Sequence, residues 1–280
     1  MAAAPLATVV LPGALGDNVV RLAWLVAAPV LVAGASTRRA WVAVAAGAAT
    51  AVWPVVNSVE QISRSADPSA TAGFYRPLAS ELQHQIAAAG PAALGERVEV
   101  VPTRTHWETR YLSERFQLAR GWDRQADVAD NSVFYQEGGL TSRSYAEWLR
   151  QMAVGWVARP ATPLDSAGTA EGALVDAAPA YLELVWHDRA WRLYRVVPAA
   201  PLATGARVVA VRASSVTLHF DRAGTASVAL RWTSYLVAVR TADGSGPDAS
   251  VAPRGQFISV AAPTAGDYEL RSDFRFPSPR

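Results

Sequence analysis

Residues 97–124 read RVEVVPTRTHWETRYLSERFQLARGWDR, a stretch in which a short apolar segment runs into a dense mixture of arginine, histidine, aromatic and acidic side chains. Val98–Val101 predicts a brief strand. Pro102 marks its end, because proline has no backbone N–H to donate to a sheet. The stretch also divides the chain, since long apolar runs precede it and alternating helix and strand patterns follow it.

Two apolar runs lie on the N-terminal side, VVRLAWLVAAPVLVAGA at residues 19–35 and AWVAVAAGAATAVWPVV at residues 40–56. Each is close to the minimum length that crosses a hydrocarbon core of about 30 Å. Arg38 and Arg39 in the turn between them indicate a cytoplasmic turn by the positive-inside rule. We therefore predict a membrane hairpin in the cell membrane, with the chain after about residue 57 extracytoplasmic. The alternative is a pair of buried alanine-rich helices in a soluble protein.

Residues 58–200 carry the patterns of a small α/β domain. A polar linker is expected at residues 57–73, and an amphipathic helix follows it. Three apolar residues at helical spacing would face the core of the domain: Leu78, Leu82 and Ile86. Residues 124–139, RQADVADNSVFYQEGG, are polar and predict a loop.

The second half of this domain shows clearer signals. Thr141 is typical of an N-cap for a helix that runs to Met152, and VGWVARP at residues 154–160 predicts a buried strand. A short helix is expected at residues 171–177. The segment at residues 181–197 reads YLELVWHDRAWRLYRVV. Apolar and polar residues alternate in two runs on either side of a turn, which predicts a β-hairpin.

From residue 201 onward the chain consists of strand and turn patterns only. Six short alternating segments separated by turn sequences predict an antiparallel β-sandwich. The expected fold class is therefore α+β, in three parts: a two-helix membrane hairpin at residues 1–57, an α/β extracytoplasmic domain at 58–200 and a β-sandwich at 201–280.

The composition limits the chemistry. All 26 basic residues are arginine and the formal net charge is +2, which does not favour nucleic acid as a partner. The chain has no cysteine, which excludes disulfides and thiolate metal sites, and its four histidines lack the paired spacing of a metal site. The phosphate-binding loops GxGxxG and GxxxxGK are absent, so we expect neither a metal nor a cofactor.

The candidate binding residues lie in the central stretch. Arg104, His106, Trp107 and Glu108 fall within five positions. In an extended segment, alternation would place the arginine, histidine and glutamate on one face and the tryptophan on the other. An aromatic ring can stack on the face of a sugar while a guanidinium donates two parallel hydrogen bonds to anionic oxygens. The alternative is a set of structural salt bridges and hydrogen bonds.

A second group of polar residues stands just before and within the start of the first apolar run: Asp17, Asn18 and Arg21. Polar side chains at a membrane boundary are costly unless they face a cavity or a partner, so these residues are candidates for lining a substrate cavity. An ordinary interfacial loop with an anchoring arginine explains them equally well.

Several phrases together carry a resemblance, which covers roughly residues 10–200: PGALGDNVVRL, FYRPLASEL, RVEVVPTRTHWETRYL, LARGWDRQAD, NSVFYQ, LTSRSYAEWLRQMAVGWVARP and YLELVWHDRAWRLYRV. The chain resembles the C-terminal part of actinobacterial polytopic membrane proteins related to GT-C-type glycosyltransferases and to the YfhO-like group. The resemblance implies a lipid-linked sugar donor, an active site at the outer membrane face and an acidic catalytic base in an early extracytoplasmic loop.

That early loop has no counterpart here, so the resemblance implies a fragment that is inactive alone, with its catalytic residues unidentified. The first functional hypothesis is the extracytoplasmic region of a membrane glycosyltransferase that acts on polyprenyl-phosphate sugars. The alternative is a non-catalytic, membrane-anchored module that binds or assembles envelope glycan.

Overall fold

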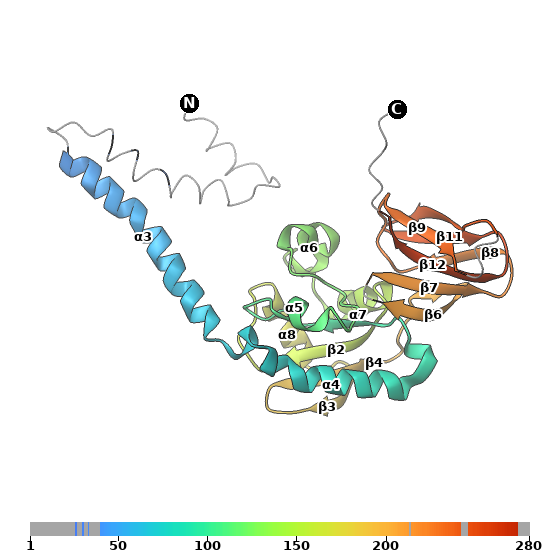
Figure 1. The fold of residues 1–280 in the computed structure, drawn as a ribbon. Coiled ribbons are helices and arrows are strands. Elements are labelled where there is room, and N and C mark those ends of the chain that lie inside the picture. The colour runs from blue at the N-terminus through green and yellow to red at the C-terminus, as the bar shows by residue number, and fades with distance from the viewer. Residues whose placement is uncertain are drawn as a thin grey trace, which may run out of the picture. The chain divides into compact units, whose positions relative to one another are not determined.

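The computed structural model describes residues 40–212, 214–241 and 246–273, together with Val26, Val30 and Ala33 (Figure 1). The chain divides between Asp67 and Pro68 into two compact units, and each is described by itself. Helices alternate with sheets in which most strand pairs are antiparallel, so the expected α+β class is confirmed.

The first unit is described through helix α3, Ala40–Ser65, which is 26 residues long. The helix contains the second apolar run and continues beyond it, so the linker predicted at residues 57–73 is wrong for residues 57–65. The continuation has a local cause. Val59 and Ile62 extend the apolar spacing, and neither glycine nor proline interrupts the sequence from residue 57 to residue 67.

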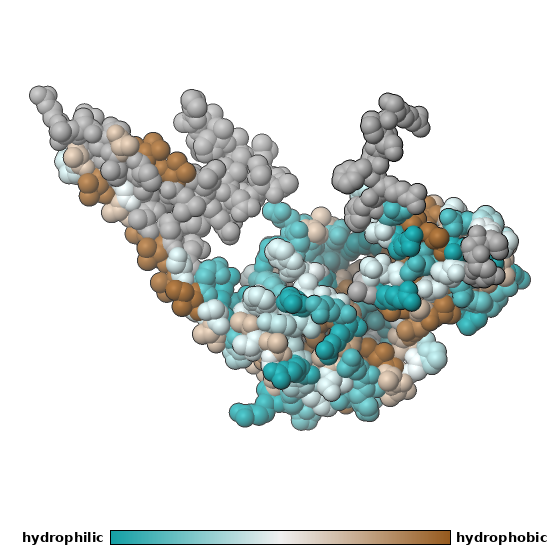
Figure 2. All heavy atoms as spheres, in the orientation of Figure 1, coloured by the Kyte–Doolittle hydropathy of each residue, from teal (hydrophilic) through white to brown (hydrophobic). Residues whose placement is uncertain are grey.

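Large apolar side chains along α3 are exposed within this unit, and they give the brown patches on the helix in Figure 2. Within the part of the chain that the structure describes, no helix is long and apolar enough to span a membrane. The first predicted run, residues 19–35, lies outside the described residues except for Val26, Val30 and Ala33. The membrane hairpin therefore stays a prediction.

The second unit begins with a short 3₁₀ helix at Pro68–Ala70 and helix α4, Ala72–Ala89. The predicted amphipathic face is present, because Leu78 and Leu82 are fully buried and Ile86 packs at the edge of the same cluster. The helix ends at Gly90, whose φ of 71° is a left-handed value that glycine adopts at little cost.

A four-stranded sheet follows, with the spatial order β1-β2-β4-β3. Its strands are β1, Arg97–Val100; β2, Val154–Pro160; β3, Leu182–His187; and β4, Trp191–Val196. The strands β1 and β2 are parallel, which requires a long crossover between them, and the predicted β3–β4 hairpin is antiparallel. All four strands correspond to segments predicted from the sequence.

Helices cover both faces of this sheet. On one face, α4 packs through Leu78 and Leu82 against Trp156 of β2 and Leu193 of β4. The other face is covered by α7, Ser142–Gln151, and α8, Gly168–Asp176, whose apolar side chains pack with those of β2 and β4. The sheet is therefore buried on both sides, and its α/β character matches the prediction.

Besides α7, the crossover between β1 and β2 contains two shorter α-helices: α5, Glu108–Leu112, and α6, Arg124–Asp130. The loop predicted at residues 124–139 is wrong where α6 forms. Asp123 explains the helix, because its carboxylate accepts hydrogen bonds from the N–H groups of Gln125 at 3.0 Å and Ala126 at 3.2 Å.

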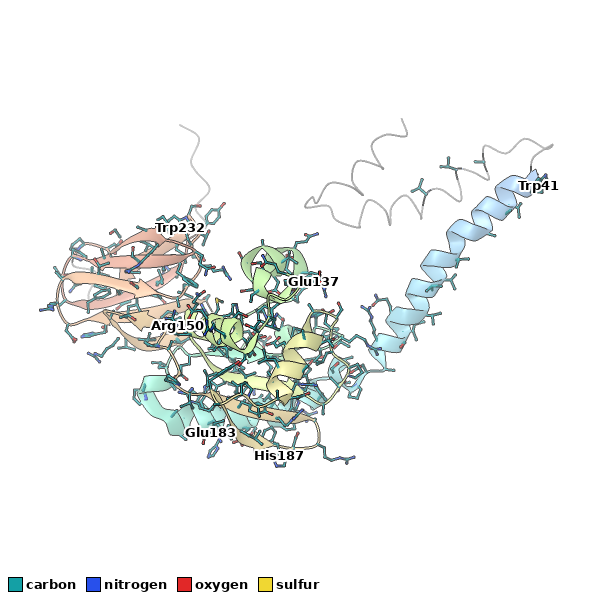
Figure 3. All side chains as sticks on the ribbon, turned by 180° about the vertical axis from the view of Figure 1, so that it is seen from behind. Trp41, Glu137, Arg150, Glu183, His187 and Trp232 are labelled. Carbon is teal, nitrogen blue, oxygen red and sulfur yellow. The ribbon has the colours of Figure 1, made fainter. Side chains whose placement is uncertain are left out.

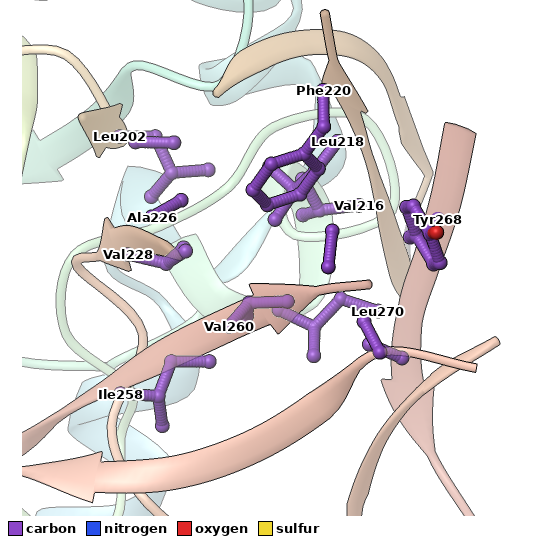
Figure 4. Close-up of a cluster of buried hydrophobic side chains, with 14 of the residues drawn as sticks. Leu202, Val216, Leu218, Phe220, Ala226, Val228, Ile258, Val260, Tyr268 and Leu270 are labelled. Carbon is purple, nitrogen blue, oxygen red and sulfur yellow. The ribbon is translucent and has the colours of Figure 1, made fainter. Parts of the chain in front are cut away.

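The remaining strands form a β-sandwich of two antiparallel four-stranded sheets, ordered β10-β11-β8-β5 and β6-β7-β12-β9. Side chains from both sheets meet in one core, including Phe220, Val260 and Tyr268 (Figure 4). The expected sandwich is therefore confirmed, although two of its strands, at residues 203–204 and 250–254, were not among the six predicted segments. Its strands are β5, Ala203–Thr204; β6, Arg207–Arg212; β7, Ser215–Phe220; β8, Gly224–Val228; β9, Leu236–Arg240; β10, Ser250–Arg254; β11, Phe257–Ala262; and β12, Gly266–Ser272.

A cluster of buried charges lies inside the α/β domain around Arg120, whose side chain is 4% exposed. Its guanidinium donates to Glu99 of β1 at 2.6 and 2.9 Å and to Glu171 of α8, and it lies 3.7 Å above the ring of Phe134. Tyr145 of α7 donates to the second oxygen of Glu171 at 2.8 Å. One arginine therefore connects β1, α7 and α8 in the interior, where charges are tolerated only with such partners.

Candidate functional site

The candidate site is built on the segment that leaves β1. Thr103 pairs with Leu164 as an isolated antiparallel bridge, and the N–H of Arg104 donates to the carbonyl of Pro163 at 3.0 Å. The backbone then turns at residues 104–105, and α5 begins at Glu108. The extended alternation predicted for residues 104–108 is therefore wrong, because a turn and a helix start replace the strand.

His106 stands at the centre of this turn with a φ of 57°. A left-handed backbone costs about 1–2 kcal/mol for a residue with a Cβ, so other interactions must hold His106 there. Its N–H donates to the carbonyl and the hydroxyl of Thr103, both at 3.2 Å. The imidazole lies between two carboxylates, with Nδ1 3.5 Å from Glu108 Oε1 and Nε2 3.3 Å from Asp165 Oδ2.

Hydrogen bonds to Asp165 and Glu108 raise the pKa of His106 to about 9, against the opposing effect of burial. The imidazole is therefore a cation at neutral pH, and both of its nitrogens face acceptors. Such a ring is not available as a general base, which needs an unprotonated nitrogen.

The two carboxylates are themselves held in place. Glu108 is buried and accepts a hydrogen bond from the Thr103 hydroxyl at 2.6 Å. Asp165 accepts from Arg124 at 2.5 Å and from the N–H of Ala167 at 2.9 Å. Burial raises the pKa of Asp165, but the hydrogen bonds from His106, Ala167 and Arg124 outweigh it and lower that pKa overall. His106, Glu108 and Asp165 therefore form a charge-compensated group beneath the surface, which we call the His106 cluster.

Two exposed tryptophans lie near the His106 cluster. Trp107 is 43% exposed and Trp122 is 67% exposed, and both line a surface pocket of about 620 Å³ that also includes His106 and Arg110. We call this cavity the Trp107 pocket; its full lining is Thr105, His106, Trp107, Thr109, Arg110, Ser113, Glu114 and Trp122. Trp107 stacks on Tyr111 with ring centroids 5.7 Å apart, which fixes the orientation of its ring.

The pocket combines broad aromatic surfaces with charged groups at its edge. Arg110 and Glu114 form an exposed ion pair at 2.5 Å, and His106 supplies a fixed positive charge. Among the residues that the structure describes, no group of three histidine, aspartate or glutamate side chains could hold a metal ion. The arrangement suits recognition of a polar ligand with flat faces, because aromatic rings contact the faces and charged groups orient the hydroxyls.

The predicted site residues divide into three groups. His106, Trp107 and Glu108 lie together, with the first two lining the pocket and the third supporting His106 from below. Arg104 is half-buried and does not belong to the described lining. The predicted residues Asp17, Asn18 and Arg21 lie outside the described part of the chain.

The sequence prediction missed several contributors, among them Trp122, Arg124 and Asp165. The first two belong to the quoted stretch, and their aromatic and basic character was a usable signal. Asp165 follows β2 and reaches His106 only through the fold, so no local pattern marked it. None of the family models, curated proteins or solved structures compared with this chain matches it, so its own geometry carries the functional argument.

Proposed function

We propose that this chain binds envelope glycan at the Trp107 pocket as a membrane-attached module. The observation that carries the proposal is the pair of exposed tryptophans next to the His106 cluster. Exposed tryptophan is uncommon at a random surface position, because its large apolar ring is stabilised by burial. Here the ring of Trp107 stacks on Tyr111 and is 43% exposed.

Binding is favoured over catalysis for this pocket because of the state of His106. A sugar-transfer site needs a group that accepts a proton during the reaction. His106 is already protonated at neutral pH. Its two carboxylate partners, Glu108 and Asp165, are both paired with it, and Asp165 is also paired with Arg124. The pocket is thus suited to hold a saccharide in a fixed pose.

The glycosyltransferase function that the resemblance implies is a separate prediction. It would be tested by adding a polyprenyl-phosphate sugar to membranes containing the protein and measuring sugar transfer to endogenous glycan. Transfer that depends on Asp17 but not on Trp107 would favour that function over a binding module.

Membrane attachment is the second part of the proposal. It is supported by the exposed apolar side chains of α3, which water does not favour: Trp41, Val44, Val52, Val55, Val56, Val59 and Ile62. We expect the full chain to float with lipid vesicles in a density gradient. Recovery of a monodisperse protein at the bottom of the gradient would contradict attachment.

The glycan proposal is tested by titrating the full chain with soluble oligosaccharides, neutral and acidic, in a calorimeter. Trp107→Ala and Trp122→Ala should each weaken binding by about 10- to 30-fold, the usual effect of removing a central tryptophan. Trp232→Ala is the matched control, because Trp232 is 39% exposed but belongs to the sandwich (Figure 3). Equal affinity in Trp107→Ala and the control would refute the proposal.

A further inference from the structure

A second pocket, of about 250 Å³, lies where the α/β domain meets the sandwich. We call it the Arg97 pocket. Three arginines line it: Arg97 at the start of β1, Arg120 from the buried ion cluster and Arg231 from the segment after β8. It is distinct from the Trp107 pocket, because none of the described residues lines both.

Arg97 is unusual among the buried charges. It is 7% exposed, and its guanidinium makes one hydrogen bond to the described residues, from Nη1 to the carbonyl of Met152 at 2.7 Å. No carboxylate of the described chain lies within ion-pair distance of it, whereas Arg120 has three acidic neighbours. Buried arginine is almost always accompanied by an anion, because desolvating a lone charge costs several kcal/mol.

The acidic side chains in the lining do not supply that anion. Asp123 accepts from the N–H groups that begin α6, and Asp127 accepts from Asn131 at 2.7 Å and Tyr135 at 2.5 Å. Asp130 lies 3.5 Å from Nε of Arg231. Each carboxylate thus has its own donors, which leaves the positive charge of Arg97 uncompensated by the residues that the structure describes.

The lining holds three arginines and three aspartates, so the case for an anion rests on the surroundings of Arg97 and not on the net charge of the pocket. Burial and the like charge of Arg231 lower the pKa of Arg97 to about 10, so the Arg97 guanidinium is cationic at neutral pH. Nη1 of Arg120 is buried without a hydrogen-bond acceptor in the described chain.

We propose that the Arg97 pocket binds a small tetrahedral oxyanion of the phosphate class, held by Arg97. Arg231 contributes only its charge, because its guanidinium already donates to Gln256, Asn131 and the carbonyl of Asp130. The planar guanidinium donates two parallel hydrogen bonds to such an anion, and the buried position of Arg97 strengthens them by excluding water. This site is independent of the glycan proposal and goes beyond it.

The test is thermal unfolding of the full chain at pH 7 in inorganic phosphate, compared with sodium chloride at equal ionic strength. Phosphate should raise the Tm of the wild type by about 2–4 °C at concentrations well above Kd, because a ligand stabilises the state that binds it. Arg97→Met should lose this response. Arg115→Met, which removes an exposed arginine outside the pocket, should keep it.

The same variant separates binding from a structural role. Without phosphate, Arg97→Met should have a Tm equal to or above that of the wild type, because it removes a buried charge that lacks an anion. If Arg97→Met fails to fold, Arg97→Lys is used instead and should show at most half of the phosphate response, since lysine lacks the planar fork.

Two results would overturn the proposal: a Tm of the wild type that rises no more in phosphate than in chloride, or a response that is unchanged when Arg97 is replaced. Trp107→Ala should respond to phosphate as the wild type does. Failure at one pocket is therefore distinguishable from failure at the other.

Discussion

At the scale of single residues, the interior depends on Arg120. Replacing it with methionine leaves Glu99 and Glu171 buried without their cation, and breaking a buried pair in this way costs about 3–5 kcal/mol. We expect urea denaturation of Arg120→Met to show a loss of that size. The control is Arg110→Met, which removes a solvent-exposed pair and should cost under about 1 kcal/mol. Losses of similar size in both variants would show that the buried cluster contributes little.

His106 gives a residue-scale prediction about pH. Its pKa is raised from an ordinary 6.5 to about 9 in the folded state. The folded chain therefore binds this proton more tightly than the unfolded chain does. The resulting stabilisation is complete below about pH 6.5, falls as pH rises and is lost through about pH 9.

The measurement is the free energy of unfolding from pH 6 to pH 10, for the wild type and for His106→Gln. The advantage of the wild type should shrink across this interval, while other titrating groups cancel in the difference. A difference that does not change with pH would mean that His106 titrates at the same pH in both states. An NMR titration of the imidazole in the folded chain should give a midpoint near 9.

At the scale of elements, α7 is the helix whose start was predicted from a single residue. Thr141 accepts a hydrogen bond from the N–H of Ser144 at 3.1 Å, and the Ser144 hydroxyl accepts from the N–H of Thr141 at 2.8 Å. Together they form a capping box, which satisfies two backbone donors that the helix itself cannot.

Removing this cap should destabilise the α/β domain, because α7 packs on the sheet through Leu149 and Trp148. Thr141→Ala should lower the free energy of unfolding by about 1 kcal/mol. Thr141→Ser keeps the hydroxyl and should stay within a few tenths of the wild type. Equal losses in the two variants, measured by urea denaturation, would assign the effect to the lost methyl group.

At the scale of the whole second unit, the junction between the α/β domain and the sandwich is tight. Gly95 has a φ of 89°, and a Cβ placed there would lie 3.0 Å from Cδ2 of Leu202 and 3.4 Å from Cγ1 of Val208. Arg231 strengthens the junction by donating to the carbonyl of Asp130 at 2.5 Å. The two modules therefore share packed surfaces and hydrogen bonds.

Gly95→Ala tests this packing, and Gly90→Ala is the matched control. Both glycines have a positive φ, but a Cβ at Gly90 would meet nothing within 4 Å. Each substitution should cost on the order of 1–3 kcal/mol for the backbone, and Gly95→Ala should cost roughly a further 1–3 kcal/mol for overpacking. Equal Tm values for the two variants would mean that the residues around Gly95 make room for the added Cβ without a loss of stability.

The order of helices and strands could largely be predicted from the sequence, because helical periodicity, strand alternation and helix caps are local signals. They predicted α4, α7, α8, the β3–β4 hairpin and a strand-only C-terminal module. The misses were also local: α6 depends on the capping by Asp123, and α3 continues through a polar segment that reads as a linker. Polar composition alone does not distinguish a loop from an exposed helix.

The sequence by itself determined the α+β class, the sandwich and the stretch that contains His106 and the two pocket tryptophans. Only the tertiary structure decided which side chains meet. It brought Asp165 to His106 through a turn and a left-handed residue and placed Arg120 among three carboxylates from separate elements. Among the described residues, it left Arg97 without a carboxylate partner. The physical reason is that ion pairs and pockets depend on distances between elements far apart in the chain, whereas periodicity reports only on neighbours.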